Sequence, residues 1–413
     1  MKTAFRRVLL LWLAWAVLLC GFQWAVAARI RLARPDDVLS WTAAETTADA
    51  HRQQPYLLEP FLNDHVAWDS EFYLSIAVAG YDDPLVRTTG PADARLSLNY
   101  AFMPFYPLVT RIISWPLRVF GLTPIATATL AGVLVSLLGA LGGMLALYDL
   151  AREEFGESGG LRAAFYLVAF PTGFFLAQVH TEGLFVGLAF GCLALIRRKR
   201  FGWAALLAVG ATWTRAVGVA LVIPLALPWL RAGDWMALDL EWRQIFFKGI
   251  PWKALGKGLL RLAPLLAFVV WRMSYLGASF NTVEDMFFGR GFLSLGTSFF
   301  TWSEAFRSIF GANPETTVYY LIEFAAIALG LAACRAMWRS DPDMAAYSLA
   351  AIVLSLTSGP AQGMHRYILA APVVFLFLAR LGRHEVFDRA WSLASILLMG
   401  LLVTLFTFDF WVG

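Results

Sequence analysis

Six ionisable residues lie inside or beside apolar stretches of the sequence, where charge is costly. They are Asp69 in the segment WDSEFY, His180 and Glu182 in VHTEG, Arg215 in TWTRAVG, and His365 and Arg366 in GMHRY. A carboxylate can accept the proton of a hydroxyl nucleophile. Arginine guanidinium groups stay charged in poorly solvated sites and can bind phosphate oxygens in pairs. Together these residue types are suited to a transfer from a phosphate leaving group to a hydroxyl acceptor.

The rest of the chain has the composition of a membrane protein. Of its 413 residues 59% are hydrophobic and only 15% are charged, and the mean hydropathy is +0.63. A net charge of +4 could indicate a nucleic-acid partner, but the long apolar runs favour a lipid bilayer instead, so we expect no nucleic acid. Cys20, Cys192 and Cys334 each fall within an apolar run, which favours small core residues over disulfides or a metal site.

Apolar runs of about 20 residues, with shorter and longer ones tolerated, predict about eleven transmembrane helices. The predicted crossings are 8–27, 123–150, 161–179, 181–196, 201–214, 216–230, 258–276, 317–334, 344–358, 368–381 and 390–406. Residues 201–230 could form one long tilted helix, but two short helices meeting at Thr214 and Arg215 keep the topology consistent. We therefore predict an all-α polytopic membrane protein with a single domain, 1–413, in which residues 28–122 form a long first extracytoplasmic loop with interfacial helices and 123–413 form the remaining bundle.

The distribution of basic residues predicts a cytoplasmic N-terminus, because most lysines and arginines then face the cytoplasm. Residues 240–262, which interleave tryptophans with basic residues, are typical of an amphipathic helix on the inner leaflet. Residues 1–27 also resemble a secretory signal peptide with an A-x-A cleavage site in AVAA, although their apolar run is long enough to span the bilayer. The predicted location is the cell membrane, with all six ionisable residues near the extracytoplasmic face.

Several segments together resemble the PIG-V-like family of membrane mannosyltransferases, which belongs to the GT-C superfamily. They are WDSEFYLSIAVAGY, NYAFMPFYPLVTRII, FPTGFFLAQVHTEGLFVGLAF, TRAVG and HRYILAAP, and they extend over residues 68–372. The resemblance implies a GT-C-like bundle and transfer of one hexose from a polyprenyl-phosphate-linked donor to a hydroxyl of an acceptor glycolipid or glycan, with inversion. The family usually has Tyr-Thr-Glu-Ser where this chain has His-Thr-Glu-Gly, which leaves the sugar and the acceptor open.

The residues fit roles in that reaction. Asp69 is the expected catalytic base, because the resemblance places an acidic residue of the first outward loop near the acceptor. Arg215 and Arg366 are the expected ligands of the donor phosphate, and His180, Glu182 and His365 are further candidates for binding donor phosphate or substrate. The sequence has no Asp-x-Asp metal motif, so we expect no metal and no cofactor.

Each of these residues also has a purely structural interpretation. Asp69 could be the N-cap of a helix over 70–79 that ends at Gly80. The His180 and Glu182 side chains could cap a helix hairpin at the interface, and Arg366 could extend from a helix end toward water. Three charged residues of the segment NTVEDMFFGRGF, namely Glu284, Asp285 and Arg290, would form a solvated surface, and the C-terminal FWVG would be an interfacial anchor.

Other classes of protein remain open. A lipid-linked oligosaccharide ligase would use a lipid-pyrophosphate donor and transfer a whole oligosaccharide. A lipid or sugar transporter or flippase would also gather charge in a membrane cavity, although the sequence has no visible internal repeat. A non-catalytic assembly subunit would retain the hydrophobic helices without needing Asp69.

Overall fold

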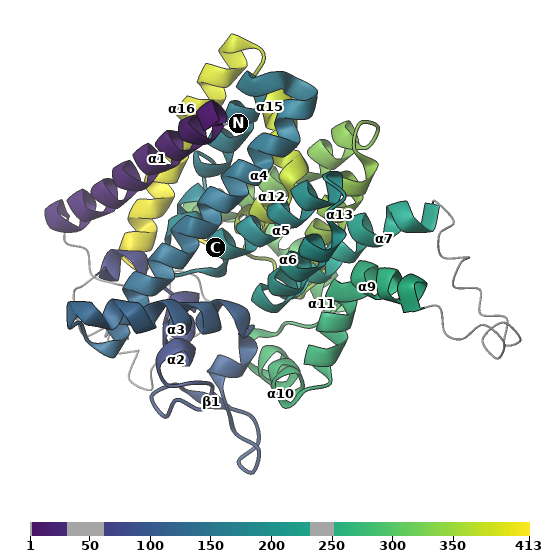
Figure 1. Ribbon diagram of the computed structural model, residues 1–413. Helices are drawn as coiled ribbons and strands as arrows, with labels where there is room; N and C mark the ends of the chain where they lie inside the picture. Colours follow the sequence, from purple (N-terminus) through teal and green to yellow (C-terminus); the bar gives the residue numbers. More distant parts are fainter. Residues whose placement is uncertain (1, 31–61, 232–251) are drawn as a thin grey trace, which may run out of the picture.

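The computed structural model describes residues 2–30, 62–231 and 252–413, which form an almost entirely helical protein (Figure 1). The exception is a short antiparallel pair of strands, β1 (Thr88–Thr89) and β2 (Leu96–Ser97), in which Thr88 lies opposite Ser97. Within the described residues the predicted all-α class is confirmed.

The helices of the first half of the chain are α1 (Lys2–Arg29), α2 (Asp69–Val78), α3 (Phe105–Leu117), α4 (Pro124–Val168), α5 (Thr181–Arg197), α6 (Phe201–Thr214) and α7 (Val222–Arg231). Those of the second half are α9 (Trp252–Arg272), α10 (Tyr275–Val283), α11 (Leu295–Ser308), α12 (Pro314–Met337), α13 (Pro342–Leu356), α14 (Met364–Tyr367), α15 (Pro372–Leu381) and α16 (Glu385–Thr407). In Figure 1, α2, α3, β1 and α10 lie at one end of the bundle, and the N-terminus of α1 lies at the other.

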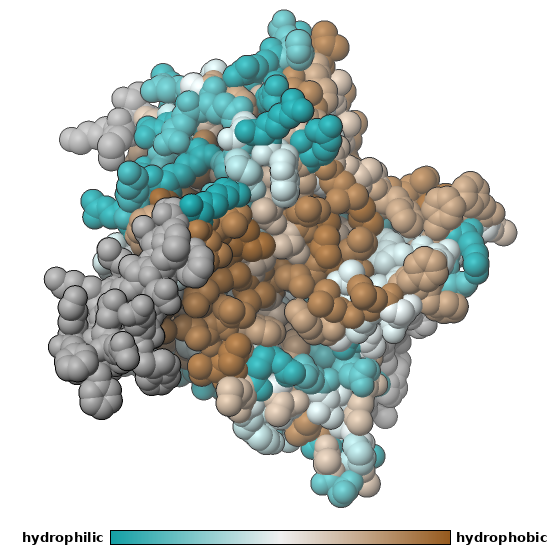
Figure 2. Space-filling view, turned by 90° about the vertical axis from the view of Figure 1, so that its right-hand side faces the viewer, coloured by the Kyte–Doolittle hydropathy of each residue, from teal (hydrophilic) through white to brown (hydrophobic). Residues whose placement is uncertain are grey.

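Helices of membrane-spanning length and hydropathy identify a multi-pass membrane protein. Among the described residues α1, α4, α12 and α16 qualify singly, and two bent pairs, 258–272 with 275–288 and 364–370 with 372–381, raise the number from four to six. The predicted number of eleven is not confirmed, because several predicted crossings are short helices, among them α6 and α13. Figure 2 shows a hydrophobic band between two more hydrophilic ends, as a bilayer environment requires.

The long helix α4 reverses direction within its assigned span. Gly156 has non-helical backbone angles, with φ 73° and ψ −177°. In a straight helix Tyr148 and Gly160 would lie about 18 Å apart, yet a Cβ placed on Gly160 would be 2.8 Å from the Tyr148 ring. The chain therefore turns back here, which agrees with two separate crossings. The third predicted crossing, 161–179, is wrong at its end, because the α-helix stops at Val168.

The close packing of α4 against α5 fixes the height of the site residues in the bundle. A Cβ added to Gly139 or Gly183 would collide with the backbone of the facing helix. Small residues permit this approach, as is common between membrane helices. Beside this contact the Ser136 hydroxyl donates a hydrogen bond to the His180 carbonyl (3.0 Å), which ties the start of α5 to α4.

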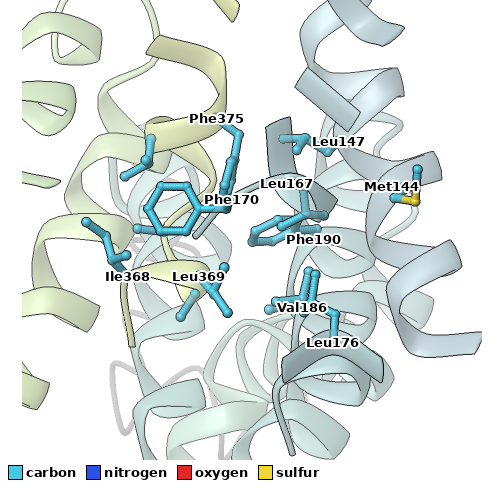
Figure 3. Packing of buried hydrophobic residues seen from close by; sticks show 14 of the residues in the cluster. Met144, Leu147, Leu167, Phe170, Leu176, Val186, Phe190, Ile368, Leu369 and Phe375 are labelled. Carbon is cyan, nitrogen blue, oxygen red and sulfur yellow. The ribbon is translucent and has the colours of Figure 1, made fainter. Parts of the chain in front are cut away.

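The main hydrophobic core lies between α4, α5 and α15 (Figure 3). Phe190 of α5 and Phe375 of α15 are fully buried there, with ring centroids 6.4 Å apart. This core supports two of the segments that carry the ionisable residues. His180 and Glu182 lie at the start of α5, and His365 and Arg366 lie in α14, just before α15.

Two further predictions concern chain boundaries. The predicted break at Thr214 and Arg215 is confirmed, because α6 ends at Thr214 and Arg215 is extended (φ −148°, ψ 133°) before the chain continues as 3₁₀ helix. The first part of the predicted amphipathic helix, 240–251, lies outside the described residues. Its remainder, 252–262, belongs to α9 and is continuous with the crossing that follows.

Candidate functional site

Four segments that are distant in sequence bring opposite charges together. Asp69 Oδ2 lies 3.1 Å from Arg366 Nη2, and Arg366 Nε lies 3.3 Å from Glu182 Oε1. The same Glu182 oxygen is ion-paired with Arg215 Nη1, and Glu182 Oε2 lies 3.8 Å from His180 Nδ1. The predicted convergence of these segments is therefore present in the structure, whereas the catalytic and binding roles stay predictions. We call Asp69, Glu182, Arg215 and Arg366 the ionic cluster.

Asp69 is the first residue of α2 and follows a strained residue. Trp68 has φ 55° and ψ −115°, a conformation that costs a residue with a side chain roughly 1–3 kcal/mol. Its indole packs edge-on against Trp411, with ring centroids 4.9 Å apart. The N-cap of α2 is Trp68, so the interpretation of Asp69 as a capping residue is wrong. Asp69 instead directs its carboxylate to Arg366, and 23% of its side chain is exposed.

Glu182 lies in the first turn of α5, where the positive end of the helix dipole favours a carboxylate. His180, just before the helix, has an extended backbone and makes no side-chain capping hydrogen bond. Both side chains are buried, at 2% and 3% exposed. The interpretation of this pair as caps of a hairpin at the membrane surface is therefore wrong.

The segment before α5 is held by the first loop. His65 Nδ1 lies 3.0 Å from Gln178 Oε1, and Val179 donates its N–H to the His65 carbonyl at 3.1 Å. Burial lowers the pKa of the His65 imidazole, although the neighbouring Asp64 carboxylate opposes this effect. A neutral His65 in this position can exchange hydrogen bonds with Gln178 without adding charge to the site.

The two ionisable residues of α14 point in different directions. Arg366 is 6% exposed, so it does not extend to water as a helix-end arginine would, and it lines the cavity described below. His365 lies behind it, with Nδ1 3.1 Å from Glu323 Oε1 and Nε2 2.6 Å from the Val412 carbonyl oxygen. Glu323 is fully buried and also accepts the backbone N–H of His365 at 3.1 Å.

The C-terminal residues form part of the site. Trp411 lines the cavity, and its Nε1–H donates to the Tyr319 hydroxyl at 3.2 Å. Val412 is buried and accepts from His365. The prediction of an interfacial anchor for FWVG is therefore wrong for these two residues, which pack inside the protein.

The ionic cluster borders a cavity of about 860 Å³. Of the six predicted site residues, Asp69, Arg215 and Arg366 line it, and the other three, His180, Glu182 and His365, lie behind its wall. A large part of the remaining wall is aromatic: Phe268, Phe280, Phe287, Phe288, Phe292 and Phe300. The cavity thus joins a charged region to an apolar one.

Sequence reasoning missed Arg290 and Tyr367. Arg290 lines the cavity and donates from Nη1 to the Tyr367 hydroxyl at 2.7 Å, so its assignment to a solvated surface is wrong. The Tyr367 ring lies 4.9 Å from the guanidinium carbon of Arg215, 5.2 Å from that of Arg366 and 5.7 Å from that of Arg290. Glu284, assigned to the same surface, also lines the cavity, whereas Asp285 is exposed.

The positive charge of the cavity wall is carried mainly by the arginines that surround the Tyr367 ring. Arg215 and Arg366 are both paired with Glu182, whereas Arg290 makes no ion pair within the described residues. Glu284 and Asp69 lie close enough to Arg290 to interact with it electrostatically, and other parts of the wall carry the carboxylates of Glu71, Glu304 and Asp409. An anion would find three guanidinium groups together only around Tyr367 among the described residues of the wall.

The possible metal ligands and the three cysteines give two further observations. Among residues 2–30, 62–231 and 252–413, no group of three or more His, Cys, Asp or Glu side chains is arranged to hold a metal ion. Cys20, Cys192 and Cys334 are free thiols, and the last two are buried, as the sequence predicted.

Comparison with known proteins gives only distant likenesses. No protein-family model and no curated protein match the sequence. ArnT from Cupriavidus metallidurans in the apo state is 19% identical, with 92% of this chain and 61% of that chain covered and a TM-score of 0.43. AglB, an archaeal oligosaccharyltransferase from Archaeoglobus fulgidus in complex with an inhibitory peptide and a dolichol-phosphate, is 13% identical, with 97% and 56% covered and a TM-score of 0.43.

ArnT bound to undecaprenyl phosphate is 14% identical, with 90% of this chain and 78% of that chain covered and a TM-score of 0.33. The chain spans 61% and 56% of the lengths of the first two structures. Identities and TM-scores at this level assign no activity to the chain. Its own structure is that of a multi-pass helical membrane protein with an ionic cluster beside a cavity that is partly charged and partly apolar.

Proposed function

We propose that the chain is a GT-C-type membrane glycosyltransferase, specifically a mannosyltransferase. It transfers one hexose from a polyprenyl-phosphate-linked donor to a hydroxyl of a glycolipid or glycan acceptor, at the extracytoplasmic face of the membrane. The observation that carries the proposal is the ion-paired Asp69, which borders a cavity with guanidinium groups at one part of its wall and phenylalanines at another.

Asp69 is the proposed catalytic base. Arg366 Nη2 lies 3.1 Å from Oδ2 and orients the carboxylate, whereas Oδ1 has no partner within the described residues. Oδ1 is therefore free to accept the proton of the acceptor hydroxyl. The acceptor oxygen bonds to the anomeric carbon as the bond from that carbon to the phosphate oxygen breaks on the opposite face, so the anomeric configuration inverts and polyprenyl phosphate leaves.

Guanidinium groups are the proposed ligands of the donor phosphate. Arg215 and Arg366 are held in place by Glu182, and Arg290, which donates a hydrogen bond to Tyr367, adds a third guanidinium group. Charge-assisted hydrogen bonds from preorganised arginines stabilise negative charge that develops on a leaving group. In this account the phosphate needs no divalent ion. His180 and His365 support the site from behind its wall.

The aromatic wall supports a lipid donor. A polyprenyl phosphate combines one anionic head with a long apolar chain, and the cavity offers arginines for the head and phenylalanines, Phe287, Phe288 and Phe292 among them, for the first isoprene units. A nucleotide sugar has no corresponding apolar part and would leave this wall in contact with water.

Reconstitution into liposomes tests the proposal. The purified protein should transfer a hexose from a polyprenyl-phosphate hexose, with mannose as the preferred sugar, and not from a nucleotide sugar alone. Asp69→Asn is nearly isosteric and should lower turnover about 100-fold or more. Asp93→Asn, which changes an exposed carboxylate in the same loop, should leave turnover unchanged.

Three outcomes would contradict the proposal. Retention of more than about a tenth of turnover in Asp69→Asn would exclude the base role. Transfer of an intact oligosaccharide from a lipid pyrophosphate would identify a ligase. Movement of a labelled lipid or sugar across the liposome bilayer without any transfer product would identify a transporter.

A further inference from the structure

A second polar groove lies at the end of the bundle opposite the ionic cluster. It has a volume of about 800 Å³ and is lined by Arg335, Arg339, Arg380, Glu154, Ser340, Ala336, Phe377 and Leu381. Glu154 lies 18 residues beyond Ser136, which contacts the start of α5, so about 27 Å of α4 separates the two levels. That distance is close to the thickness of the hydrocarbon core of a bilayer. The groove therefore lies at the other membrane surface.

The three arginines of the groove carry charge that the described residues do not neutralise. Carboxylates at this end of the bundle are already paired with other arginines: Asp341 and Glu153 with Arg197, Asp343 with Arg231, and Asp149 with Arg198 and Arg152. Arg335, Arg339 and Arg380 make no ion pair within the described residues and are exposed. A single arginine at a helix C-terminus offsets the helix dipole, but three that converge on one groove also repel one another. Among the described residues that line the groove, Glu154 is the only carboxylate.

Apolar surface continues from the groove toward the membrane band. Ala336 and Phe377 line the groove. Leu331, one helical turn before Arg335 on the same face of α12, is 43% exposed, and the adjacent Trp338 is 46% exposed. An exposed tryptophan at this level is typical of the lipid headgroup region. A ligand that fits both the arginines of the groove and the apolar surface beside it has an anionic head and hydrocarbon chains.

We propose that this groove is a binding site for one anionic phospholipid of the leaflet opposite the ionic cluster. Its phosphate lies among the guanidinium groups of Arg335, Arg339 and Arg380, and its acyl chains follow the exposed side of α12 past Leu331. Such a lipid would bridge the C-terminal ends of α12 and α15 beside the turn in α4, where basic pockets between membrane helices bind acidic head groups. The site is independent of the proposed transferase reaction.

Native mass spectrometry of the full-length chain in detergent tests this site with two probes that have the same acyl chains, phosphatidylglycerol and phosphatidylcholine. The first should bind with one saturable high-affinity site, and the second should not. The triple variant Arg335→Gln, Arg339→Gln, Arg380→Gln should weaken phosphatidylglycerol binding roughly 100-fold, or about 5-fold for each guanidinium removed. Glu154→Gln should strengthen it several-fold, because it removes a negative charge from the wall of the groove.

The matched control removes three positive charges from other positions at this end of the bundle. Arg6, Lys199 and Arg200 are exposed and lie outside the groove, so their triple substitution by Gln should leave the saturable site intact. Equal binding of the two lipids by the wild type would overturn the proposal. So would an equal loss of affinity in the groove and control variants, or a Glu154→Gln variant that binds phosphatidylglycerol no more tightly than the wild type. Inorganic phosphate at millimolar concentration should not displace the lipid, and complete displacement would identify a simple anion site instead.

Discussion

Removal of the buried charge of Glu182 should strongly destabilise the protein. It is 3% exposed and is ion-paired with both Arg215 and Arg366. Glu182→Gln preserves the shape of the side chain but leaves the buried Arg366 and the partly buried Arg215 with only Asp69 as an ion-paired carboxylate within the described residues. Breaking a buried ion pair by removing one partner costs about 3–5 kcal/mol. We expect the free energy of unfolding to fall by that amount.

The matched control is Glu157→Gln, which removes an exposed carboxylate. Its ion pair with Arg7 spans 3.3 Å, with side chains 70% and 54% exposed, so its loss should cost no more than about 1 kcal/mol. Equilibrium unfolding in mixed micelles, followed by tryptophan fluorescence, measures both. The double variant Glu182→Gln with Arg215→Gln should be less destabilised than the sum of the single variants by about 1 kcal/mol or more, because it restores charge balance. A loss for Glu182→Gln as small as that for Glu157→Gln would refute the charged state of the cluster.

Four further predictions test the geometry of the site. Arg290→Gln should weaken the binding of polyprenyl phosphate about 10-fold or more in a competition assay, because it removes charge-assisted hydrogen bonds, and an unchanged affinity would remove Arg290 from the phosphate site. Transferase activity should persist in EDTA, whereas strict dependence on added Mg²⁺ or Mn²⁺ would contradict phosphate binding by arginines alone. In a background without native cysteines, Ala216→Cys should react with a membrane-impermeant thiol reagent in intact cells and Ser340→Cys only after lysis; the reverse pattern would invert the proposed orientation. Gly139→Ala should destabilise the fold by about 1–3 kcal/mol because its methyl group meets the backbone of α5, whereas Gly21→Ala, which meets nothing within 4 Å, should be neutral or stabilising in a melting experiment.

The meeting of distant charged segments could be predicted from the sequence because it depends on topology alone. Once the apolar runs alternate between membrane faces, Asp69, Glu182 and Arg366 fall at the same face. The structure adds the ion pairs among them. Local signals were also readable: the predicted helix over 70–79 corresponds to α2 (Asp69–Val78), and Gly80 follows it with φ 99°.

The direction of each side chain could not be predicted in the same way. His365 and Arg366 are neighbours in sequence, so topology treats them alike, yet the short helix α14 turns them about 100° apart. Arg366 faces the cavity and His365 faces Glu323. Glu323 lies within the apolar run of α12, and only packing of that helix against α14 brings it to the imidazole. A single buried glutamate gives no hint in the sequence of the partner that it meets.

Arg290 could not be assigned for a related reason. Its segment, NTVEDMFFGRGF, also contains Glu284 and Asp285, and charged residues between predicted crossings are typical of a solvated loop. The chain, however, bends by 77° between residues 258–272 and 275–288, and the Gly291 N–H donates to the Ser358 carbonyl at 2.8 Å. This long-range contact brings Arg290 beside Tyr367. Tertiary hydrogen bonds of this kind leave no periodic signal, so the composition of the segment was the wrong guide.

The C-terminal tryptophan illustrates the limit of composition more generally. An indole offers a large apolar body and one N–H donor, and a membrane interface and a cavity wall can satisfy both equally well. Here the body of Trp411 packs against Trp68 and its N–H donates to Tyr319. Because Trp68 has a strained backbone and directly precedes Asp69, the contact with Trp411 helps to hold the carboxylate where Arg366 can reach it. The tail therefore supports the proposed base from the far end of the sequence, through a strained residue that only the folded chain could place.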